Sequence, residues 1–255
     1  MRLSQSVILE TLLILASLVP VAATQTSGTQ PLPSGTAVPI VFSHTLDASK
    51  LKVGDFIQAK TTQVILLPGG ERIPRGAKLD GKIVAGRPLT SQGPSELSFR
   101  FDTLAYRNKS VPVQMRVRAM ASFVDSSSVM FALIDYGNQD NSLFGQVGGD
   151  TYIPNDAVHS PSGAQVGKAT GDGVFAKLTA SEESHSKTSI SCGGNEALQS
   201  VGIFSSGACG LYGFDDLSLD EPGTNDGTIQ FHSDRHAAKI ARGTVALMQV
   251  VSSPE

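Results

Sequence analysis

The chain has no tryptophan, only two cysteines and few charged side chains, which make up 17% of its 255 residues. Long solvated helices usually carry more Glu, Lys and Ala than this. The 26 glycines and 13 prolines instead favour many short strands joined by turns. Because 40% of the residues are apolar, the chain has enough hydrophobic material for a core. The composition therefore predicts a mainly β fold.

A strong charge of either sign is also absent, since 20 Lys and Arg residues face 23 Asp and Glu residues. This balance creates no global field that would hold nucleic acid or an anionic bilayer. The glycine motifs that cradle nucleotides and the Gly-x-Ser-x-Gly turn of serine hydrolases are missing as well. We therefore predict no nucleic-acid partner, no cofactor and no catalytic residue.

The first 23 residues indicate an exported protein. Arg2 supplies a positive start, residues 7–19 form an apolar stretch, and the small residues 21–23 follow. This order predicts a signal peptide that is cleaved after Ala23, which places the mature chain in the periplasm or outside the cell. The alternative is an uncleaved anchor, although the stretch contains Glu10 and is shorter than the ~20 residues that span a bilayer. No later segment is long and apolar enough to span, so we expect no stable membrane span in the mature chain.

Residues 24–38 are polar and contain Pro and Gly, so they predict a flexible linker before a β-rich domain over 39–255. Within that domain, apolar and polar residues alternate over 97–103 and 111–119. This period of two predicts a hairpin around the polar residues 106–110. Further strands are expected at 40–42, 56–59, 228–231 and 244–251, and at 64–67 and 77–83, which are expected to flank a turn that starts at Pro68-Gly69-Gly70. The last of these runs is almost continuously apolar, which suits a central strand covered on both faces.

Residues 137–195 differ from the rest, because Gly, Ser, Asn, Asp and Thr dominate there. We interpret this stretch as a long, poorly structured Gly/Ser-rich insertion on the surface. The alternative is a set of ordered loops that carry a binding face. The whole pattern predicts a barrel-like or sandwich-like antiparallel domain, and alternation alone does not separate these two architectures.

A short internal echo connects two distant parts of the chain. Ile-Pro-Arg-Gly at 73–76 and Ile-Ala-Arg-Gly at 240–243 each precede a predicted strand. Glycine permits a backbone conformation closed to other residues. Both segments therefore predict a tight turn that starts a strand in register.

Residues 53–59 (VGDFIQA), the apolar strand that ends at Leu67, and residues 73–81 (IPRGAKLDG) resemble the β-domain of TrbI-type scaffold proteins. That family belongs to conjugation and type IV secretion channels, and residues 97–117 are similar to the strand pair that follows there. The resemblance covers about residues 38–120. It implies a barrel-like or sandwich-like domain in the cell envelope with a scaffold role. Family members also carry an inner-membrane helix and a long Pro-rich arm, whereas this sequence predicts a signal peptide and a short linker.

Cys192 and Cys209 form an even pair in a chain expected to enter an oxidising compartment, so they predict a disulfide. Two free buried thiols and half of a metal site are the alternatives. Structural zinc needs four ligands at close spacings, and neither cysteine has a second Cys or a His nearby.

Two groups of residues are weak candidates for metal binding. His232, Asp234 and His236 could present two imidazoles and a carboxylate on one side of a strand. The alternative is a polar connection before the last strand. The acidic residues at 215–216 and 220–221 fit no standard calcium loop and suit a solvated strand end. We therefore predict no metal site.

Basic residues of the predicted hairpin are candidates for a binding face toward acidic polymers of the envelope. They are Arg100, Arg107, Lys109, Arg116 and Arg118. Ordinary solvation of an open sheet face explains the same residues. The sequence thus favours an exported, non-catalytic envelope domain with a structural or interaction role, whose partners are envelope proteins or wall polymer. The alternatives are a glycan- or wall-polymer-binding module and a secreted enzyme with its site in the 137–195 insertion.

Overall fold

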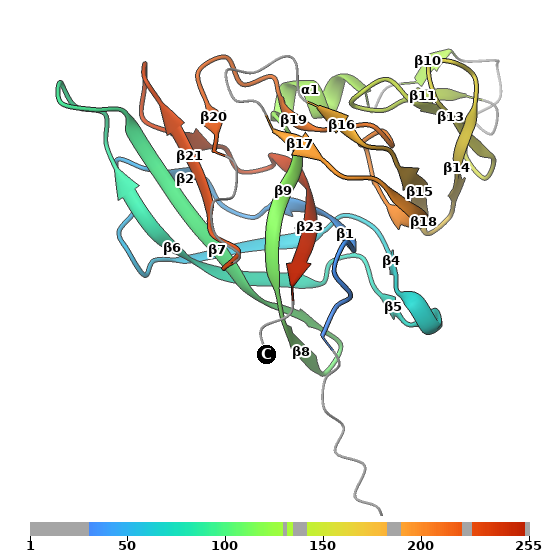
Figure 1. Ribbon diagram of the computed structural model, residues 1–255, viewed down its shortest axis with the longest axis horizontal. Helices are drawn as coiled ribbons and strands as arrows, with labels where there is room; N and C mark the ends of the chain where they lie inside the picture. Colours follow the sequence, from blue (N-terminus) through green and yellow to red (C-terminus); the bar gives the residue numbers. More distant parts are fainter. Residues whose placement is uncertain (1–30, 130–131, 135–141, 183–189, 221–225, 253–255) are drawn as a thin grey trace, which may run out of the picture.

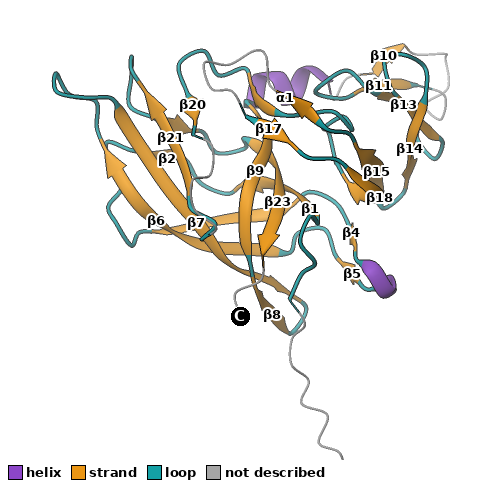
Figure 2. Cartoon of the chain, viewed as in Figure 1, coloured by secondary structure: helices purple, strands orange, loops and turns teal. Residues whose placement is uncertain are grey.

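The computed structural model describes residues 31–129, 132–134, 142–182, 190–220 and 226–252. The predicted signal peptide and residues 24–30 of the predicted linker lie outside these ranges. Strands dominate the described chain, which has one short α-helix, α1 (Phe123–Val129), and one 3-10 turn, η1 (Pro68–Gly70) (Figure 2). The prediction of a mainly β fold is confirmed. Within the described ranges, no helix has the length and apolarity to cross a membrane.

Ten strands form the main sheet, and nearly all of its neighbours are antiparallel. In lateral order they are β19 (Gly210–Tyr212), β9 (Gln114–Ala121), β23 (Val245–Ser252), β1 (Ala37–Phe42), β3 (Phe56–Thr61), β6 (Lys78–Arg87), β7 (Ser95–Tyr106), β21 (Ile229–Ser233) and β20 (Ser218–Leu219), with β8 (Lys109–Pro112) as a further partner of β7. Among these pairs only β19 and β9 run parallel. The end strands β19 and β20 are not paired with each other, so the sheet is not a closed barrel.

The main sheet is rolled around one hydrophobic core, because its strands all send side chains to the same cluster. Phe42, Phe99, Phe101 and Phe231 form the aromatic centre of this cluster, with neighbouring ring centroids 5.8–6.2 Å apart. Offset and edge-to-face contacts at such distances stabilise aromatic pairs beyond their buried area. The predicted alternation over 97–103 is therefore real, with Phe99 and Phe101 on the inner face.

The echo at 73–76 and 240–243 marks two equivalent turns. In each, the amide after the glycine donates to the carbonyl three residues earlier, at 3.4 Å and 3.1 Å. Gly76 and Gly243 have φ values of +82° and +87°, which a type II turn requires at this position. Both turns lead from a two-residue strand, β5 (Arg72–Ile73) or β22 (Lys239–Ile240), into a long one.

The equivalence extends across the centre of the sheet, where β1 and β3 are related by a local twofold. The amide of Ser43 donates to the carbonyl of Gln58 at 3.0 Å, and the amide of Thr62 donates to the carbonyl of Pro39 at 2.9 Å. The local twofold axis exchanges residue 43 with residue 62 and residue 39 with residue 58, so it converts one of these bonds into the other. The two residues of each exchanged pair are 19 positions apart in the sequence. The short partners also correspond, because β2 (Leu46–Asp47) pairs with β22 as β4 (Ile65–Leu66) pairs with β5.

The insertion forms a second sheet. After β9 the chain leaves the main sheet and returns at β19. In between it makes seven antiparallel strands, β10 (Ala132–Ile134), β11 (Leu143–Gly145), β12 (Thr151–Tyr152), β13 (Ala157–His159), β14 (Gln165–Thr170), β15 (Gly173–Leu178) and β18 (Asn195–Ser200). The pair β16 (Ser181–Glu182) and β17 (Ser191–Cys192) lies beside them. The expected insertion is therefore present, but the prediction that it is poorly structured is wrong for its described residues.

Glycine in this stretch has a structural use that composition hides. A Cβ at Gly167 would collide with the carbonyl oxygen of Phe175 on the neighbouring strand, so glycine lets β14 and β15 approach. The short, turn-rich strands resemble loops in composition because few of their positions need large apolar side chains.

The second sheet packs on the outer side of β9, β23 and β1, which gives a sandwich-like arrangement (Figure 1). Ala37, Ala119 and Leu247 of the main sheet contact a cluster that includes Val174 and Ala176 of β15. Small side chains allow the two layers to approach closely. This is why β23 has buried residues on both faces, as its apolar run predicts.

Buried polar side chains also join the two layers. The amide of Gln63 donates to the carbonyl of Val174 and accepts from its amide, both at 2.9 Å. Gln199 of β18 accepts from the amide of Ala37 at 2.9 Å. These bonds give the buried backbone amides of Val174 and Ala37 a hydrogen-bond acceptor.

Three details of the predicted organisation are different in the structure. β7 pairs with β8 through a turn at Arg107, and the chain then crosses to β9, which pairs with β23 instead of β7. The run 64–67 contains β4, whose partner is β5, while β6 pairs with β3 and β7. The ordered domain also begins within the predicted linker, because Leu32 belongs to the main core and is 2% exposed.

Candidate functional site

The second sheet covers only part of the main sheet, and the outer side of β3, β6, β7 and β21 stays uncovered by it. We call this surface the open face. Its side chains include Phe56, Gln58, Lys60, Lys78, Asp80, Lys82, Arg100, Asp102, Gln230 and His232. Their alternation with buried neighbours follows from the period of two in a strand.

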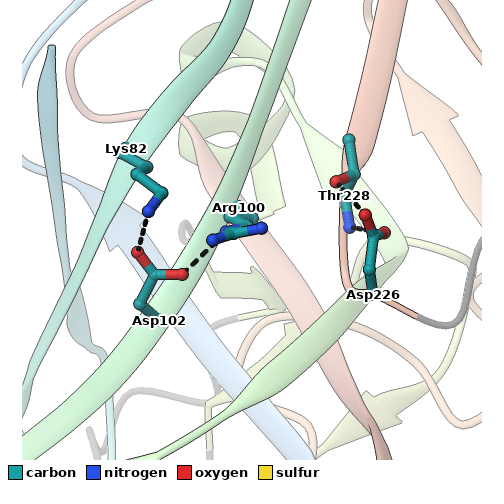
Figure 3. Close-up of polar contacts among 5 residues, drawn as sticks. All are labelled: Lys82, Arg100, Asp102, Asp226 and Thr228. Atoms are coloured by element: carbon teal, nitrogen blue, oxygen red, sulfur yellow. Dashed lines mark hydrogen bonds and ion pairs between the residues drawn. The ribbon is translucent and has the colours of Figure 1, made fainter. Parts of the chain in front are cut away.

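Charges on the open face are linked across strands (Figure 3). Lys82 and Arg100 both point toward the carboxylate of Asp102, at 3.7 Å and 2.8 Å. Beyond Arg100 lies Thr228, whose amide and hydroxyl donate to the carboxylate of Asp226 at 2.9 Å and 3.0 Å. Partly exposed ion pairs of this kind contribute little to the free energy of folding. Charged groups of a binding partner can therefore replace either member of a pair at little cost in stability.

An aromatic ring stands at the end of the same cross-strand row. Phe56 pairs with Lys82, which pairs with Arg100. The Phe56 side chain is 64% exposed, although phenylalanine usually lies in the core. Exposed aromatic rings beside charged groups are typical of interaction surfaces.

Where the rolled sheet fails to close, β9 faces β20 and β21 across a seam. Gly227 lies so close to β9 that a Cβ there would be 3.1 Å from the backbone nitrogen of Met115. Beside this contact is a cavity of about 190 Å³, which we call the seam cavity. Its lining residues are Arg116, Val117, Arg118, Ile190, Ser191, Cys192, Leu219, Asp220, Thr228, Ile229 and Gln249.

Two guanidinium groups line the seam cavity in different ways. Arg116 is half-buried, and its Nε and Nη2 donate to the amide oxygen of Gln249 at 3.2 Å and 2.7 Å. Arg118 is 1% exposed and donates to the carbonyls of Gly193, Thr179 and Ser206 at 2.5 Å, 2.7 Å and 3.3 Å. Burial, with the nearby Arg116 cation, lowers the pKa of Arg118 to about 10. Arg118 therefore stays charged at neutral pH.

A β-bulge explains why Arg118 is buried. Met248 pairs with Val117 and Leu247 pairs with Ala119, so Arg118 is the extra residue of β9. The alternation that predicts a solvated Arg118 stops at the bulge. Beyond it, the outer side of β9 is covered by the second sheet.

The five predicted basic residues do not form one face. Arg100 lies on the open face, Arg116 lines the seam cavity, and Arg118 is buried between the layers. Arg107 is exposed in the β7–β8 turn with φ +51°, and Lys109 pairs there with Glu71 at 2.6 Å. The predicted face assumed that the two strands after residue 95 are paired, and β9 belongs to another part of the sheet.

The histidines of the predicted metal candidate are engaged separately. His232 contacts Asp220 at 3.0 Å, and His236 contacts Asp216 at 2.7 Å. No group of three potential ligands for a metal ion occurs within the described ranges. Both pairs join the segment around β20 to β21 and the residues that follow it.

A second concavity of about 720 Å³ adjoins the seam cavity and shares Asp220 with it. We call it the rim groove. Its polar walls include the ion pair of Arg87 and Glu96 and the side chains of Gln230 and His232. The sequence pattern did not predict that Thr228, Gln249 and Asp220 line one cavity, because only the rolling of the sheet brings these distant residues together.

Cys192 and Cys209 form the expected disulfide, with Cα atoms 6.0 Å apart. Cys192 is next to Gly193, whose carbonyl accepts from Arg118. The disulfide therefore closes a loop that contains two of the three carbonyls that accept from Arg118, those of Gly193 and Ser206.

A scan against protein-family models, a search of curated proteins and a search of solved structures each find no match to this chain. The resemblance to TrbI-type scaffold proteins therefore stays a prediction.

Proposed function

We propose that this chain is an exported, non-catalytic interaction domain of the cell envelope, which binds its partner through the open face. The observation that carries the proposal is the unequal covering of the main sheet. One half of its outer side is covered by the second sheet, while the other half presents Phe56, Lys82, Arg100 and Asp102 to solvent. Mixed charges around an exposed aromatic ring suit a polar partner that exchanges these ion pairs on binding.

The compartment part of the proposal rests on the leader-like residues 1–23 and on the disulfide, since such bonds persist in oxidising compartments. Cell fractionation tests it directly. The expected result is a mature chain that starts at Thr24 in the periplasmic or secreted fraction. Full-length chain confined to the cytosol would overturn export.

The interaction part is tested by crosslinking the tagged protein in cells and identifying partners from the envelope fraction. The double variant Lys82→Ser with Arg100→Ser removes the two cations that contact Asp102 on the open face and leaves the core intact. A matched control is Lys177→Ser, which removes an exposed cation from the second sheet. We expect the first variant to lose at least about tenfold in partner recovery and the control to keep it. Equal recovery from both variants would count against the open face.

A glycan- or wall-polymer-binding module is the second candidate, and Phe56 favours it. Aromatic rings on open sheet faces stack on flat apolar surfaces of ligands, and the neighbouring polar groups hydrogen-bond to hydroxyls. The test is retention of the purified protein on wall polymer. We expect Phe56→Ala to lose retention if the ligand is a glycan, and to leave it unchanged if the partner is held by charge alone.

A further inference from the structure

The seam cavity has an excess of positive charge that the described residues do not neutralise. Arg116 uses two of its five N–H groups on Gln249, which is neutral, and has no carboxylate partner within the described ranges. Arg118 donates only to backbone carbonyls. Both side chains line the same cavity, so the two cations lie close to each other. Among the described lining residues there are two guanidinium groups and one carboxylate, that of Asp220, so the net positive charge attracts an anion.

A second observation points the same way. The Nε of Arg118 is buried and has no hydrogen-bond partner, which is rare for a charged donor in a folded protein. The residue belongs to the lining of the seam cavity. The Nε itself is enclosed and does not reach a ligand, so the Arg118 charge instead strengthens the attraction between the cavity and an anion held by Arg116.

We propose that the seam cavity binds a small hydroxylated organic carboxylate, such as one uronic acid residue, with its carboxylate on Arg116 and its hydroxyl groups toward Thr228 and Asp220. Arginine receives carboxylates through two parallel hydrogen bonds, and Arg116 keeps three N–H groups for this purpose. The volume of about 190 Å³ is below the range of drug-sized ligands (~300–1,000 Å³) and suits a single small residue.

The other walls favour a carboxylate over a phosphate. Asp220 also lines the cavity, and its carboxylate repels a phosphate, which carries nearly two negative charges, more strongly than it repels a singly charged carboxylate. Val117, Leu219 and Ile229 provide apolar walls against which the carbon skeleton of an organic ligand packs. Asp220 also accepts hydrogen bonds from hydroxyl groups, which an acidic sugar carries.

This inference rests on the proposed function only for the source of the ligand, an acidic polymer of the envelope, since binding itself needs only the purified protein. Titration calorimetry with glucuronate, glucose and inorganic phosphate measures the ligand class. Glucose has the same ring without the carboxylate. We expect glucuronate to bind at least about tenfold more tightly than either. Equal affinity for glucose, or tighter binding of phosphate, would overturn the carboxylate assignment.

Variants locate the site. Arg116→Gln keeps a polar side chain beside Gln249 and removes the charge, and we expect a loss of about tenfold or more in glucuronate affinity. Thr228→Val should lose a few-fold. Arg107→Gln, which removes an exposed arginine outside the cavity, should bind as the unmodified protein does. Thermal unfolding midpoints confirm that each variant is folded. Unchanged affinity in a folded Arg116→Gln protein would sink the proposal, even if envelope crosslinking through the open face succeeds.

Discussion

Arg118 shows how a single buried cation organises the region between the two layers. Its guanidinium donates to the carbonyls of Thr179, Gly193 and Ser206, and so ties three segments of the second layer to β9 of the main sheet. Hydrogen bonds from a charged donor contribute about 1.5–3 kcal/mol, and removing the donor leaves buried acceptors unsatisfied. We expect Arg118→Met to lower the free energy of unfolding by about 3 kcal/mol or more, as measured by urea denaturation.

The matched control is Arg107→Met, which removes an exposed arginine from the β7–β8 turn. Substitutions at such surface positions usually stay within about 0.5 kcal/mol. If both variants unfold at the same urea concentration, Arg118 does not stabilise the layers. The comparison also matters for function, because a loss of binding in an Arg118 variant would report unfolding instead of a lost contact.

At the scale of elements, the two turns at 73–76 and 240–243 make a prediction about backbone strain. Gly76 and Gly243 adopt positive φ, and a Cβ at either position meets no atom closer than 3.4 Å. The penalty of alanine there is therefore conformational, about 1–2 kcal/mol at each site. Gly93 is a matched control, because it lies in open space without positive φ. We expect Gly76→Ala and Gly243→Ala to destabilise in urea, and Gly93→Ala to be neutral.

The disulfide closes a segment with a sequence separation of 17. The chain-entropy model gives about 3 kcal/mol for a loop of this length. We expect the double variant Cys192→Ser with Cys209→Ser to unfold more easily by about that amount. A thiol assay on the denatured, unreduced wild-type protein should detect no free thiol. Two reactive thiols in that assay would show that the pair is reduced.

A sequence pattern predicts an element correctly when nearby residues alone determine the structure of that element. The apolar run 244–251 correctly predicts β23 as a central strand, because burial on both faces leaves its own signature. The turns at Gly76 and Gly243 are also predictable, because glycine at a positive φ is a local requirement of the turn. The partners of β6 and β9 are not, since a strand's alternation gives its faces and not its neighbour. The candidate site is the feature that the sequence predicts least well, because only the rolling of the sheet brings Arg116, Thr228 and Asp220 together.

At the scale of the whole molecule, the insertion is a second layer and not an appendage. Leu247 of β23 is fully buried and packs in the same cluster as Val174 and Ala176 of the insertion. Gln63 and Gln199 add buried hydrogen bonds between the layers. Composition does not show this second layer. Its strands are short and bury only one face, so the apolar content of 137–195 is low although the segment packs on the main sheet. The main sheet buries its outer alanines only when that layer is present.

Joint burial of the two layers predicts that they unfold together. Urea unfolding followed by far-UV circular dichroism and by tyrosine absorbance should give coincident transitions. Leu247→Ala removes a fully buried side chain from the shared cluster, and we expect it to lower stability by about 2–5 kcal/mol and to shift both signals equally. Leu198→Ala, at a position 37% exposed on β18, should shift them much less. Two separate transitions, of which Leu247→Ala shifts only one, would mean that the layers unfold independently. That outcome would contradict the prediction, because the shared cluster contains residues of both layers and its weakening should destabilise both.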